Sequence, residues 1–323
     1  MSNYIIGIDI GGTTVKFGLI SNDGELFKKW SIPTKKENNG ATIVNDIWNS
    51  LAQTIESFNI NKDTIIGIGV GIPGYVDTGS GLVYEAINIG WKNINIKQQL
   101  EELTGLPVFI ENDANIAVLG ENWRGAGNKA KHVIAVTLGT GVGGGIIANG
   151  KILNGQNGMA GELGHILIEE DGALCNCGNR GCIETIASAT GIVRQAMEEI
   201  TVNPSSPLAA FFDEKKSISS EDVFELAARG DTLAEGIVER TATILGSTFA
   251  NLGVILNPEK ILIGGGVSEA GEPLLDKITA SFRANALPRV IDACEIKLAQ
   301  LGNDAGIIGA AYLVKQNVEG ISF

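Results

Sequence analysis

Three of the four cysteines in this chain of 323 residues lie close together in the stretch CNCGNRGCIE. Cys175, Cys177 and Cys182 have C-x-C-x4-C spacing, which is typical of a ligand-bearing loop and not of a buried apolar element. One of only two histidines, His165, lies ten residues before the first of these cysteines. Three thiolates and one imidazole form a known ligand set for Zn²⁺, and a closed set of four leaves no position for water. The sequence therefore predicts a zinc ion that stabilises structure. The fourth cysteine, Cys294, is expected to pack as a small core residue.

Glycine-rich turns at the ends of apolar runs are the second feature with chemical meaning. Successive backbone N–H groups in such turns can bind an anion with no side chain in the way. Three of them together fit the phosphates and nucleoside of a nucleoside triphosphate. There is no G-x-x-x-x-G-K-[ST], which excludes a P-loop protein. The G-x-G-x-x-G at 139–144 runs into a strand-like segment and not a helix, which argues against a dinucleotide-binding fold. The turns are Gly11-Gly12-Thr13-Thr14, Gly139-Thr140-Gly141-Val142-Gly143 and Gly264-Gly265-Gly266.

Two aspartates follow apolar runs. Asp9 stands directly before the first glycine turn, where a carboxylate repels phosphate unless a cation intervenes. It is a candidate to hold Mg²⁺ through water. Asp113, in FIENDAN, can accept a proton from a substrate hydroxyl if its strand end faces a cleft. An N-cap of a helix that begins near Asn115 explains Asp113 equally well when this residue is considered alone.

Two glutamates flank the predicted zinc ligands. Glu162 lies in GMAGELGH, and Glu184 follows the last clustered cysteine by two residues. A metal ion that clamps both loops would bring these carboxylates together. Carboxylates held at fixed geometry suit a ligand with many hydroxyl groups, so the zinc is predicted to fix the floor of a polar small-molecule pocket.

Short apolar runs alternate with helical patterns along the chain, which predicts an α/β fold. A strand, glycine turn and strand at 5–21 recur at 133–153, which suggests two related lobes that face each other across a cleft. Residues 201–220 are expected to be a polar loop. Further strands are expected at 25–32, 65–74, 107–115 and 260–267, and helices at 40–58, 95–105, 116–127, 183–200, about 221–256 and on either side of 296–301.

Composition limits the possible partners. The formal net charge is −13 and the sequence pI is about 4.7, which argues against nucleic acid or an anionic membrane surface as a general partner. The N-terminus enters a strand-like run without a basic segment, and no apolar stretch is long enough for a membrane helix. We therefore expect a cytoplasmic protein.

At this point the motifs resemble those of the ROK family of repressors and sugar kinases, within the actin-like ATPase superfamily, and in particular its glucokinases of Gram-positive type. The resemblance spans essentially the whole chain. It is carried by DIGGTTVKFG (9–18), GIPG (71–74), ENDAN (111–115), LGTGVGGG (138–145), GELGH (161–165), CNCGNRGCIE (175–184), ETIASATGI (184–192) and LIGGGVS (262–268).

The resemblance implies a two-lobed, ribonuclease H-like sugar kinase fold with a cleft. A small α/β lobe of residues 1–115 would be completed by a C-terminal helix at about 304–323, and residues 116–303 would form a large lobe with the zinc loop. It implies ATP- and Mg²⁺-dependent phosphorylation of glucose to glucose 6-phosphate, the first step of glycolysis. A homodimer or a higher homo-oligomer is expected, because homodimers are common in the family.

The resemblance also implies residue roles. Asp113 would be the base on the sugar 6-hydroxyl. Sugar hydroxyls would be bound by Asn88, Asn112, Glu162, His165 and Glu184, with His165 also a zinc ligand. Phosphates would be held by Gly11, Gly12, Thr13 and Thr14 and by Gly139, Thr140 and Gly141, while Gly264, Gly265 and Gly266 would border the nucleoside.

Other functions within the family remain open from the sequence. The same pocket acceptors could serve a kinase for N-acetylmannosamine, N-acetylglucosamine, fructose, mannose or allose. A sugar-sensing protein without catalysis is a further alternative. A transcriptional repressor of this family carries a helix-turn-helix ahead of the first glycine turn, for which Asp9 lies too near the start.

Overall fold

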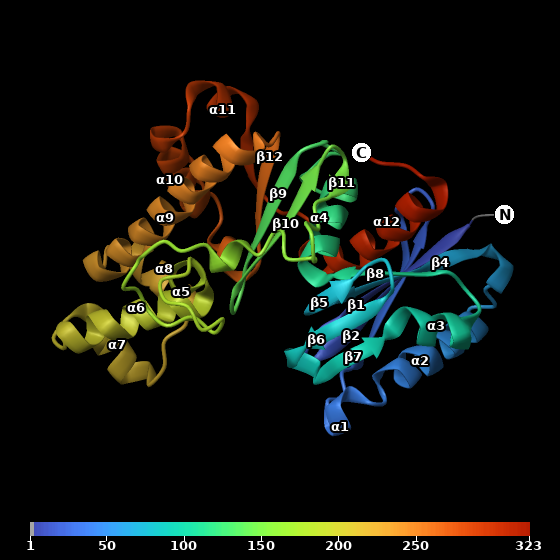
Figure 1. Cartoon of the computed structure of the whole chain (residues 1–323). Coiled ribbons are helices and arrows are strands. Elements are labelled where there is room, and N and C mark those ends of the chain that lie inside the picture. The colour runs from blue at the N-terminus through green and yellow to red at the C-terminus, as the bar shows by residue number, and fades with distance from the viewer. Residues whose placement is uncertain (1–2) are drawn as a thin grey trace. The chain divides into compact units, whose positions relative to one another are not determined.

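The computed structural model describes residues 3–323, whose internal contacts form two compact units (Figure 1). Unit 1 comprises the chain up to Lys131, Gly145–Gly161 and Gln300–Phe323, and unit 2 comprises His132–Gly144 and Glu162–Ala299. Sheets and helices occur in both units, so the predicted α/β class is confirmed. No helix in the described part of the chain combines the length and the apolar character that crossing a membrane requires.

The main sheet of unit 1 has the strand order β3-β2-β1-β4-β8. Neighbours β1, β2 and β3 run antiparallel, whereas β4 is parallel to both β1 and β8. The predicted strand, glycine turn and strand at 5–21 is the β1–β2 hairpin. The strands are β1 (Tyr4–Ile10), β2 (Thr14–Ser21), β3 (Leu26–Pro33), β4 (Ile65–Ile72) and β8 (Val108–Asn112).

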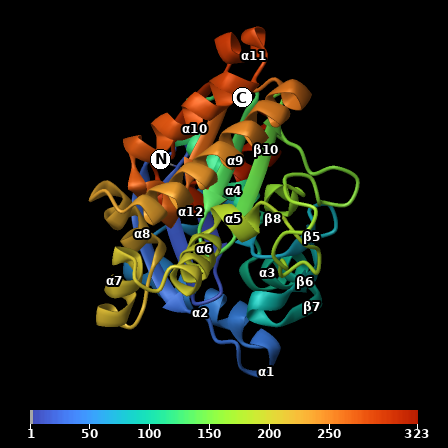
Figure 2. The same ribbon diagram turned by 90° about the vertical axis from the view of Figure 1, so that its left-hand side faces the viewer.

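The two faces of this sheet carry different side chains. Ile6 and Ile8 of β1 pack in a core with α2 (Ile43–Ser57) and α3 (Ile96–Thr104). Alternate residues face α12 (Ala305–Glu319), where a methyl group on Gly7 would lie 1.9 Å from the carbonyl oxygen of Ile307. The α12 backbone therefore lies directly on the strands (Figure 2), and Asp9 follows Gly7 on this face.

Helix α4 (Asp113–Arg124) packs along α12 at a similarly close distance. A methyl group on Gly309 would lie 1.6 Å from the carbonyl oxygen of Ile116. The buried Glu121 carboxylate accepts the N–H groups of Gln300 (2.9 Å) and Leu301 (2.6 Å), which ties the C-terminal segment to α4. These contacts place α4 in unit 1. The lobe boundary expected after residue 115 would instead assign most of this helix to the large lobe, and that boundary stays a prediction.

Unit 1 also contains a three-stranded antiparallel sheet that was not predicted from the sequence. It consists of β5 (Tyr75–Asp77), β6 (Leu82–Ala86) and β7 (Trp91–Asn95) in the order β5-β6-β7. A short 3-10 helix, Ile87–Ile89, carries Asn88 between β6 and β7. The buried Trp91 holds this region in place, because its Nε1–H donates to the carbonyl of Gly40 (3.1 Å). Gly40 is the last residue of the short helix α1 (Glu37–Gly40).

In unit 2, β12 lies between β9 and β13 and is parallel to both. Strand β10 has residues in each unit, and its end pairs with β11 in unit 1. The strands are β9 (Val133–Leu138), β10 (Val142–Ala148), β11 (Lys151–Ile152), β12 (Lys260–Gly264) and β13 (Glu295–Leu298), and the helices are α5 (Glu184–Ala187), α6 (Ala189–Val202), α7 (Pro207–Lys215), α8 (Ser220–Ala228), α9 (Thr232–Leu256), α10 (Glu272–Asn285) and α11 (Pro288–Ala293).

Two expectations for unit 2 were wrong in part. The helix predicted over 183–200 is interrupted at Ser188, whose extended backbone and side chain cap α6 through the Gly191 N–H (3.0 Å). The polar loop predicted over 201–220 contains α7. Ser206 caps α7 and Pro207 occupies its first turn, a start signal that the polar composition of the segment concealed.

Candidate active site and metal centre

The first glycine turn joins β1 to β2 and is braced by the end of β3. The Gly11 N–H donates to the Thr14 carbonyl (3.0 Å). The Thr34 hydroxyl donates to the Gly11 carbonyl (2.7 Å), and the Thr34 N–H donates to the Thr13 carbonyl (2.9 Å). A methyl group on Gly12 would make only ordinary contacts, 3.5 Å from Asn88 Cβ and 3.6 Å from Lys36 Nζ. Packing therefore does not demand glycine at position 12, whereas close approach of a ligand would.

Asp9 lies between α12 and Lys16. A methyl group on Gly306 would lie 2.7 Å from Asp9 Oδ2, so α12 leaves room for the carboxylate. Burial raises the pKa of Asp9, and Lys16, whose Nζ is 3.5 Å from Oδ2, opposes this shift. The sequence analysis missed Lys16, although the β1–β2 hairpin pairs it directly with Asp9. Asp9 thus already has one cationic neighbour, and its role toward Mg²⁺ stays a prediction.

Asp113 is the first residue of α4, and Asn112 is its N-cap. The Asn112 Oδ1 accepts the N–H groups of Ala114 (2.9 Å) and Asn115 (3.2 Å), and its amide nitrogen donates to the Gly74 carbonyl (3.1 Å). The N-cap explanation of Asp113 is therefore wrong. The half-buried Asp113 carboxylate accepts the Ala114 N–H (2.9 Å) at the positive end of the helix, which favours a negative charge.

A buried carboxylate that the sequence analysis missed lies directly before this pair. Glu111 is 3% exposed. It accepts the Asn112 N–H (2.9 Å) and the side-chain amides of Asn115 (3.0 Å) and Asn154 (3.1 Å). Burial raises the pKa of Glu111, and these three hydrogen bonds oppose the shift. A glutamate that ends an apolar strand was the available signal. Its hydrogen bonds fix the backbone from which Asp113 projects.

The predicted metal ligands come together in unit 2. One ligand atom from each of His165, Cys175, Cys177 and Cys182 can be chosen so that all lie within 4.8 Å of one another. The Cys177 and Cys182 sulfurs are 3.6 Å apart, and Cys175 Sγ is 3.6 Å from His165 Nδ1. Zinc–sulfur bonds of about 2.3 Å in a tetrahedron place sulfurs about 3.8 Å apart, so the donor set and its spacing fit Zn²⁺.

The cysteines also differ in ionisation. Burial raises the pKa of Cys175 to about 12, so a metal ion must displace a proton from this thiol to bind it. Cys294 lies outside the cluster, after α11. It is half-buried and not a core residue as expected, and burial raises its pKa to about 11.

Glu162 and Glu184 both lie beside this cluster. The His165 ring uses Nδ1 toward Cys175, while its Nε2 is 3.9 Å from Glu162 Oε2. Glu184 Oε1 is 3.5 Å from Cys175 Sγ, and Oε2 accepts the Val142 N–H (2.9 Å). One ring nitrogen of His165 is thus directed to the metal ligands and the other to a carboxylate. This division allows the imidazole to bind a metal and a second group at once.

The second glycine turn is fixed to the start of α6. The Gly139 carbonyl accepts the Ala189 N–H (2.8 Å), and the Thr140 carbonyl accepts the Thr190 hydroxyl (2.7 Å). A methyl group on Gly139 would touch nothing within 4 Å, whereas one on Gly141 would lie 2.4 Å from Glu184 Oε2. Gly141 therefore makes room for a carboxylate, and Gly139 has no packing reason to be glycine.

The third glycine turn follows β12. Gly265 has a φ of 86° and approaches the Leu138 carbonyl so closely that a methyl group would lie 2.5 Å from it. A methyl group on Gly264 would lie 3.1 Å from Ala299 Cβ, whereas one on Gly266 would meet nothing within 4 Å. The turn is thus a packed strand end with one open position.

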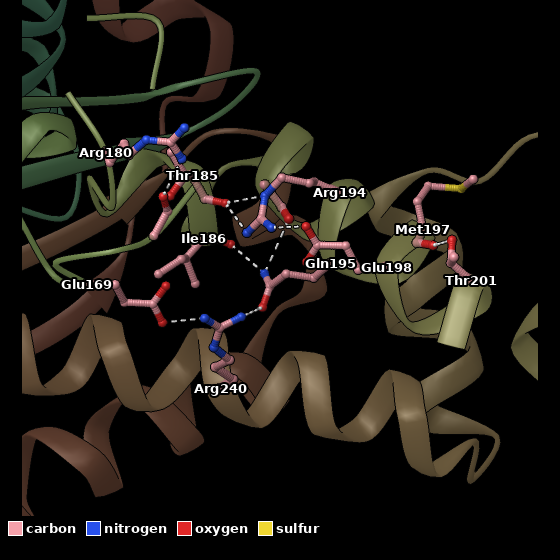
Figure 3. Close-up of polar contacts among 12 residues, drawn as sticks. Glu169, Arg180, Thr185, Ile186, Arg194, Gln195, Met197, Glu198, Thr201 and Arg240 are labelled. Atoms are coloured by element: carbon pink, nitrogen blue, oxygen red, sulfur yellow. Dashed lines mark hydrogen bonds and ion pairs between the residues drawn. The ribbon is translucent and has the colours of Figure 1, made fainter. Parts of the chain in front are cut away.

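A polar network that the sequence did not reveal holds the loop of the predicted metal ligands on the helices of unit 2 (Figure 3). Arg240 of α9 forms an ion pair with Glu169 and donates to the Gln195 side chain (2.8 Å). Gln195 in turn donates to the Ile186 carbonyl (3.0 Å), and Arg194 donates to the Thr185 carbonyl (3.0 Å). The network secures α5, which begins with Glu184.

Comparison with known proteins agrees with these motifs. Residues 5–317 match the family model described as "ROK family". A glucokinase of Halalkalibacterium halodurans is 51% identical to this chain, over 97% of this chain and 95% of its own length. A glucokinase of Thermotoga maritima is 38% identical, over 98% of both chains. The solved structure of a ROK family glucokinase from Streptomyces griseus in complex with glucose and AMPPNP is 36% identical and has a TM-score of 0.76, over 97% of this chain and all of that one. These likenesses confirm the expected fold.

Proposed function

The chain belongs to the ROK family, and we propose that it is a glucokinase, which transfers a phosphoryl group from ATP to glucose. The observation that carries this proposal is the likeness over nearly the full length to glucokinases, at 51% identity in one case. The solved relative with glucose and AMPPNP supports the same pair of substrates. Other hexoses are less well supported, because the relatives that match at 51% and 38% identity are both glucokinases.

The catalytic base in this proposal is Asp113. Its carboxylate takes the proton of the sugar 6-hydroxyl as that oxygen bonds to the terminal phosphorus of ATP, while the bond from this phosphorus to the bridging oxygen of ADP breaks. Asn112 performs the capping of α4, and Asp113 follows it as the first residue of the helix. Glu111 holds the backbone before it. Mg²⁺, bound with ATP and assisted by Asp9, would neutralise phosphate charge.

The sugar hydroxyls are assigned to five polar side chains. Glu162 and Glu184 offer carboxylate oxygens, and His165 offers the ring nitrogen that faces Glu162. Asn112 retains one amide hydrogen after its bond to Gly74, which is enough for one sugar hydroxyl. Asn88 is exposed beside the first glycine turn and completes the set.

The phosphates and the nucleoside are assigned to the glycine turns. Gly12, Gly139 and Gly266 support this assignment best, because packing explains none of them. Gly11, Thr13 and Thr14 shape the first turn, Thr140 and Gly141 continue the second, and Gly264 and Gly265 set the third.

The metal centre is assigned to a structural Zn²⁺ held by His165, Cys175, Cys177 and Cys182. The donor set and its spacing support this assignment. The ion would fix the loop that carries Glu184 and the ring orientation of His165. We further propose that the enzyme acts in the cytoplasm, in the first step of glycolysis, as a homodimer.

A coupled ADP-release assay with ATP and Mg²⁺ tests the function across glucose, mannose, fructose, N-acetylglucosamine and N-acetylmannosamine. We expect a clear preference for glucose. Preference for an N-acetyl sugar would replace the substrate, and silence on all five sugars would refute the kinase. Asp113→Asn should lower kcat by about 10²–10⁴-fold with little change in sugar binding, whereas Asp23→Asn, at an exposed site of the same unit, should not.

A further inference from the structure

The segment after β3 delivers a lysine to the first glycine turn. Thr34 is 9% exposed and makes two hydrogen bonds to this turn, one from its hydroxyl to Gly11 and one from its N–H to Thr13. The following residues, Lys35 and Lys36, are therefore held at a fixed distance from the turn. Neither lysine was singled out by the sequence motifs.

The two lysines have different surroundings. Lys35 Nζ pairs with Asp46 Oδ1 (3.1 Å), whose other oxygen accepts the Thr42 hydroxyl (2.9 Å). Lys36 has no carboxylate within ion-pair distance among residues 3–323, and its Nζ would lie 3.6 Å from a methyl group on Gly12. One lysine is thus neutralised by a neighbour, and the other presents an unneutralised ammonium group at a turn built for an anion.

Asn88 identifies the part of the substrate that this ammonium group would meet. Its Cβ would lie 3.5 Å from the same methyl position on Gly12. Lys36 therefore lies where a phosphate-binding turn adjoins a side chain assigned to the sugar. In the proposed reaction, the group that lies between the nucleotide and the sugar is the terminal phosphate of ATP, which is the one transferred.

We propose that Lys36 binds the terminal phosphate of ATP and stabilises its charge during transfer to the sugar. This inference rests on the proposed function. The ammonium group forms hydrogen bonds to non-bridging oxygens of the phosphoryl group, keeps its own proton, and leaves proton removal to the base. Negative charge shifts toward ADP as the bond to the bridging oxygen breaks, and a fixed cation beside the transferred group lowers the barrier.

The decisive variant is Lys36→Gln, with Lys35→Gln as its matched control. Each change removes one positive charge from adjacent residues, so a general effect on net charge or on the segment appears in both. Removal of a group that stabilises transferring charge costs about 10²–10³-fold in kcat, and for an exposed ammonium we expect a decrease of about 10–10²-fold. Lys36→Arg should retain most of the activity, because it keeps the charge.

Nucleotide affinity separates this role from a structural one. Isothermal titration should show that Lys36→Gln weakens binding of a non-hydrolysable ATP analogue by about fivefold or more, a differential contact of about 1 kcal/mol, and leaves ADP affinity nearly unchanged. Lys35→Gln should change neither, and the KM for glucose should change little in either variant. Equal losses for ADP and the analogue, or kcat values that match between the two variants, would overturn the inference.

Failure of the proposed function would look different. It would appear in the unmodified protein, as no ADP release with any hexose of the panel. Discrimination between the ATP analogue and ADP can still be measured in that case, because it requires no acceptor sugar. In that case the inference fails if the unmodified protein and Lys36→Gln discriminate equally between the ATP analogue and ADP.

Discussion

Replacement of Glu111 by alanine tests whether this buried carboxylate holds the start of α4. Glu111 is 3% exposed and accepts three N–H donors, from the Asn112 backbone and from the Asn115 and Asn154 side chains, at 2.9–3.1 Å. Glu111→Ala removes all three acceptor contacts at once. The donors would then point into the space that the carboxylate occupied, directly beneath the predicted base Asp113.

The expected cost follows from these contacts. A hydrogen bond to a charged acceptor contributes about 1.5–3 kcal/mol, and a buried donor left without a partner costs about 1–3 kcal/mol. The three bonds share one carboxylate, and removing its buried charge recovers part of the loss, so the terms do not add. We expect the free energy of unfolding to fall by about 3–5 kcal/mol, a large part of the roughly 5–15 kcal/mol that stabilises a typical domain.

Urea unfolding followed by circular dichroism measures this change, and Glu111→Gln is the matched control. Glutamine keeps one carbonyl acceptor but presents its own amide N–H groups to donors, so we expect a loss between that of alanine and zero. Steady-state kinetics well below the unfolding midpoint should also show a lower kcat with a smaller change in KM for ATP. A loss below about 1 kcal/mol for Glu111→Ala would refute the reasoning.

Three further predictions concern other parts of the molecule. Gly12→Ala should leave the urea midpoint unchanged, because its methyl group makes only ordinary contacts, but should weaken ATP binding by about tenfold or more in titration calorimetry; normal affinity would show that phosphate does not approach this residue. Cys177→Ser should remove bound zinc in metal analysis while Cys294→Ser does not, and an unmodified protein without zinc would end the assignment. Burial raises the pKa of Asp222, but hydrogen bonds from Lys215 and the Ser219 N–H lower it overall. The Asp222 carboxylate therefore stabilises the fold at neutral pH, and this contribution is lost as the pH falls through the folded-state pKa. Asp222→Asn should therefore cost about 1–2 kcal/mol at pH 7 and progressively less below about pH 4, and a gap independent of pH would contradict this.

The strands and glycine turns could be predicted from the sequence because their signals are local. Alternating apolar residues that end in glycine specify a buried strand and a tight turn within a few positions, as at 5–21. The helix α7 was missed for the opposite reason. Its start signal, Ser206 and Pro207, stands inside a segment whose overall polarity indicated a loop. The polar composition averaged over 201–220 therefore predicted a loop, although Ser206 and Pro207 alone decide that a helix begins there.

The grouping of the four predicted metal ligands could be foreseen because they are rare residue types at close spacing, and the structure brings all of them together. The contacts around the predicted catalytic residues were not. Gly306 reaches Asp9 from nearly 300 residues away, and Asn154 reaches Glu111 across 43 residues. Of these contacts, only the one between Lys16 and Asp9 could have been predicted from the sequence, because an antiparallel hairpin with a known turn fixes which residue pairs with Asp9.

The small residues of α12 and α4 explain how segments distant in the sequence position Asp9 and Asp113, the two predicted catalytic carboxylates. Asp9 occupies space left by Gly306 in the first turn of α12, and Asp113 begins α4. The two helices touch backbone to backbone at Gly309, where a methyl group would lie 1.6 Å from the Ile116 carbonyl oxygen. No side chain separates them that could adapt by changing rotamer, so a shift of one helix must move the other. The positions of Asp9 and Asp113 are therefore coupled through the packing of the C-terminal helix, although neither residue belongs to it.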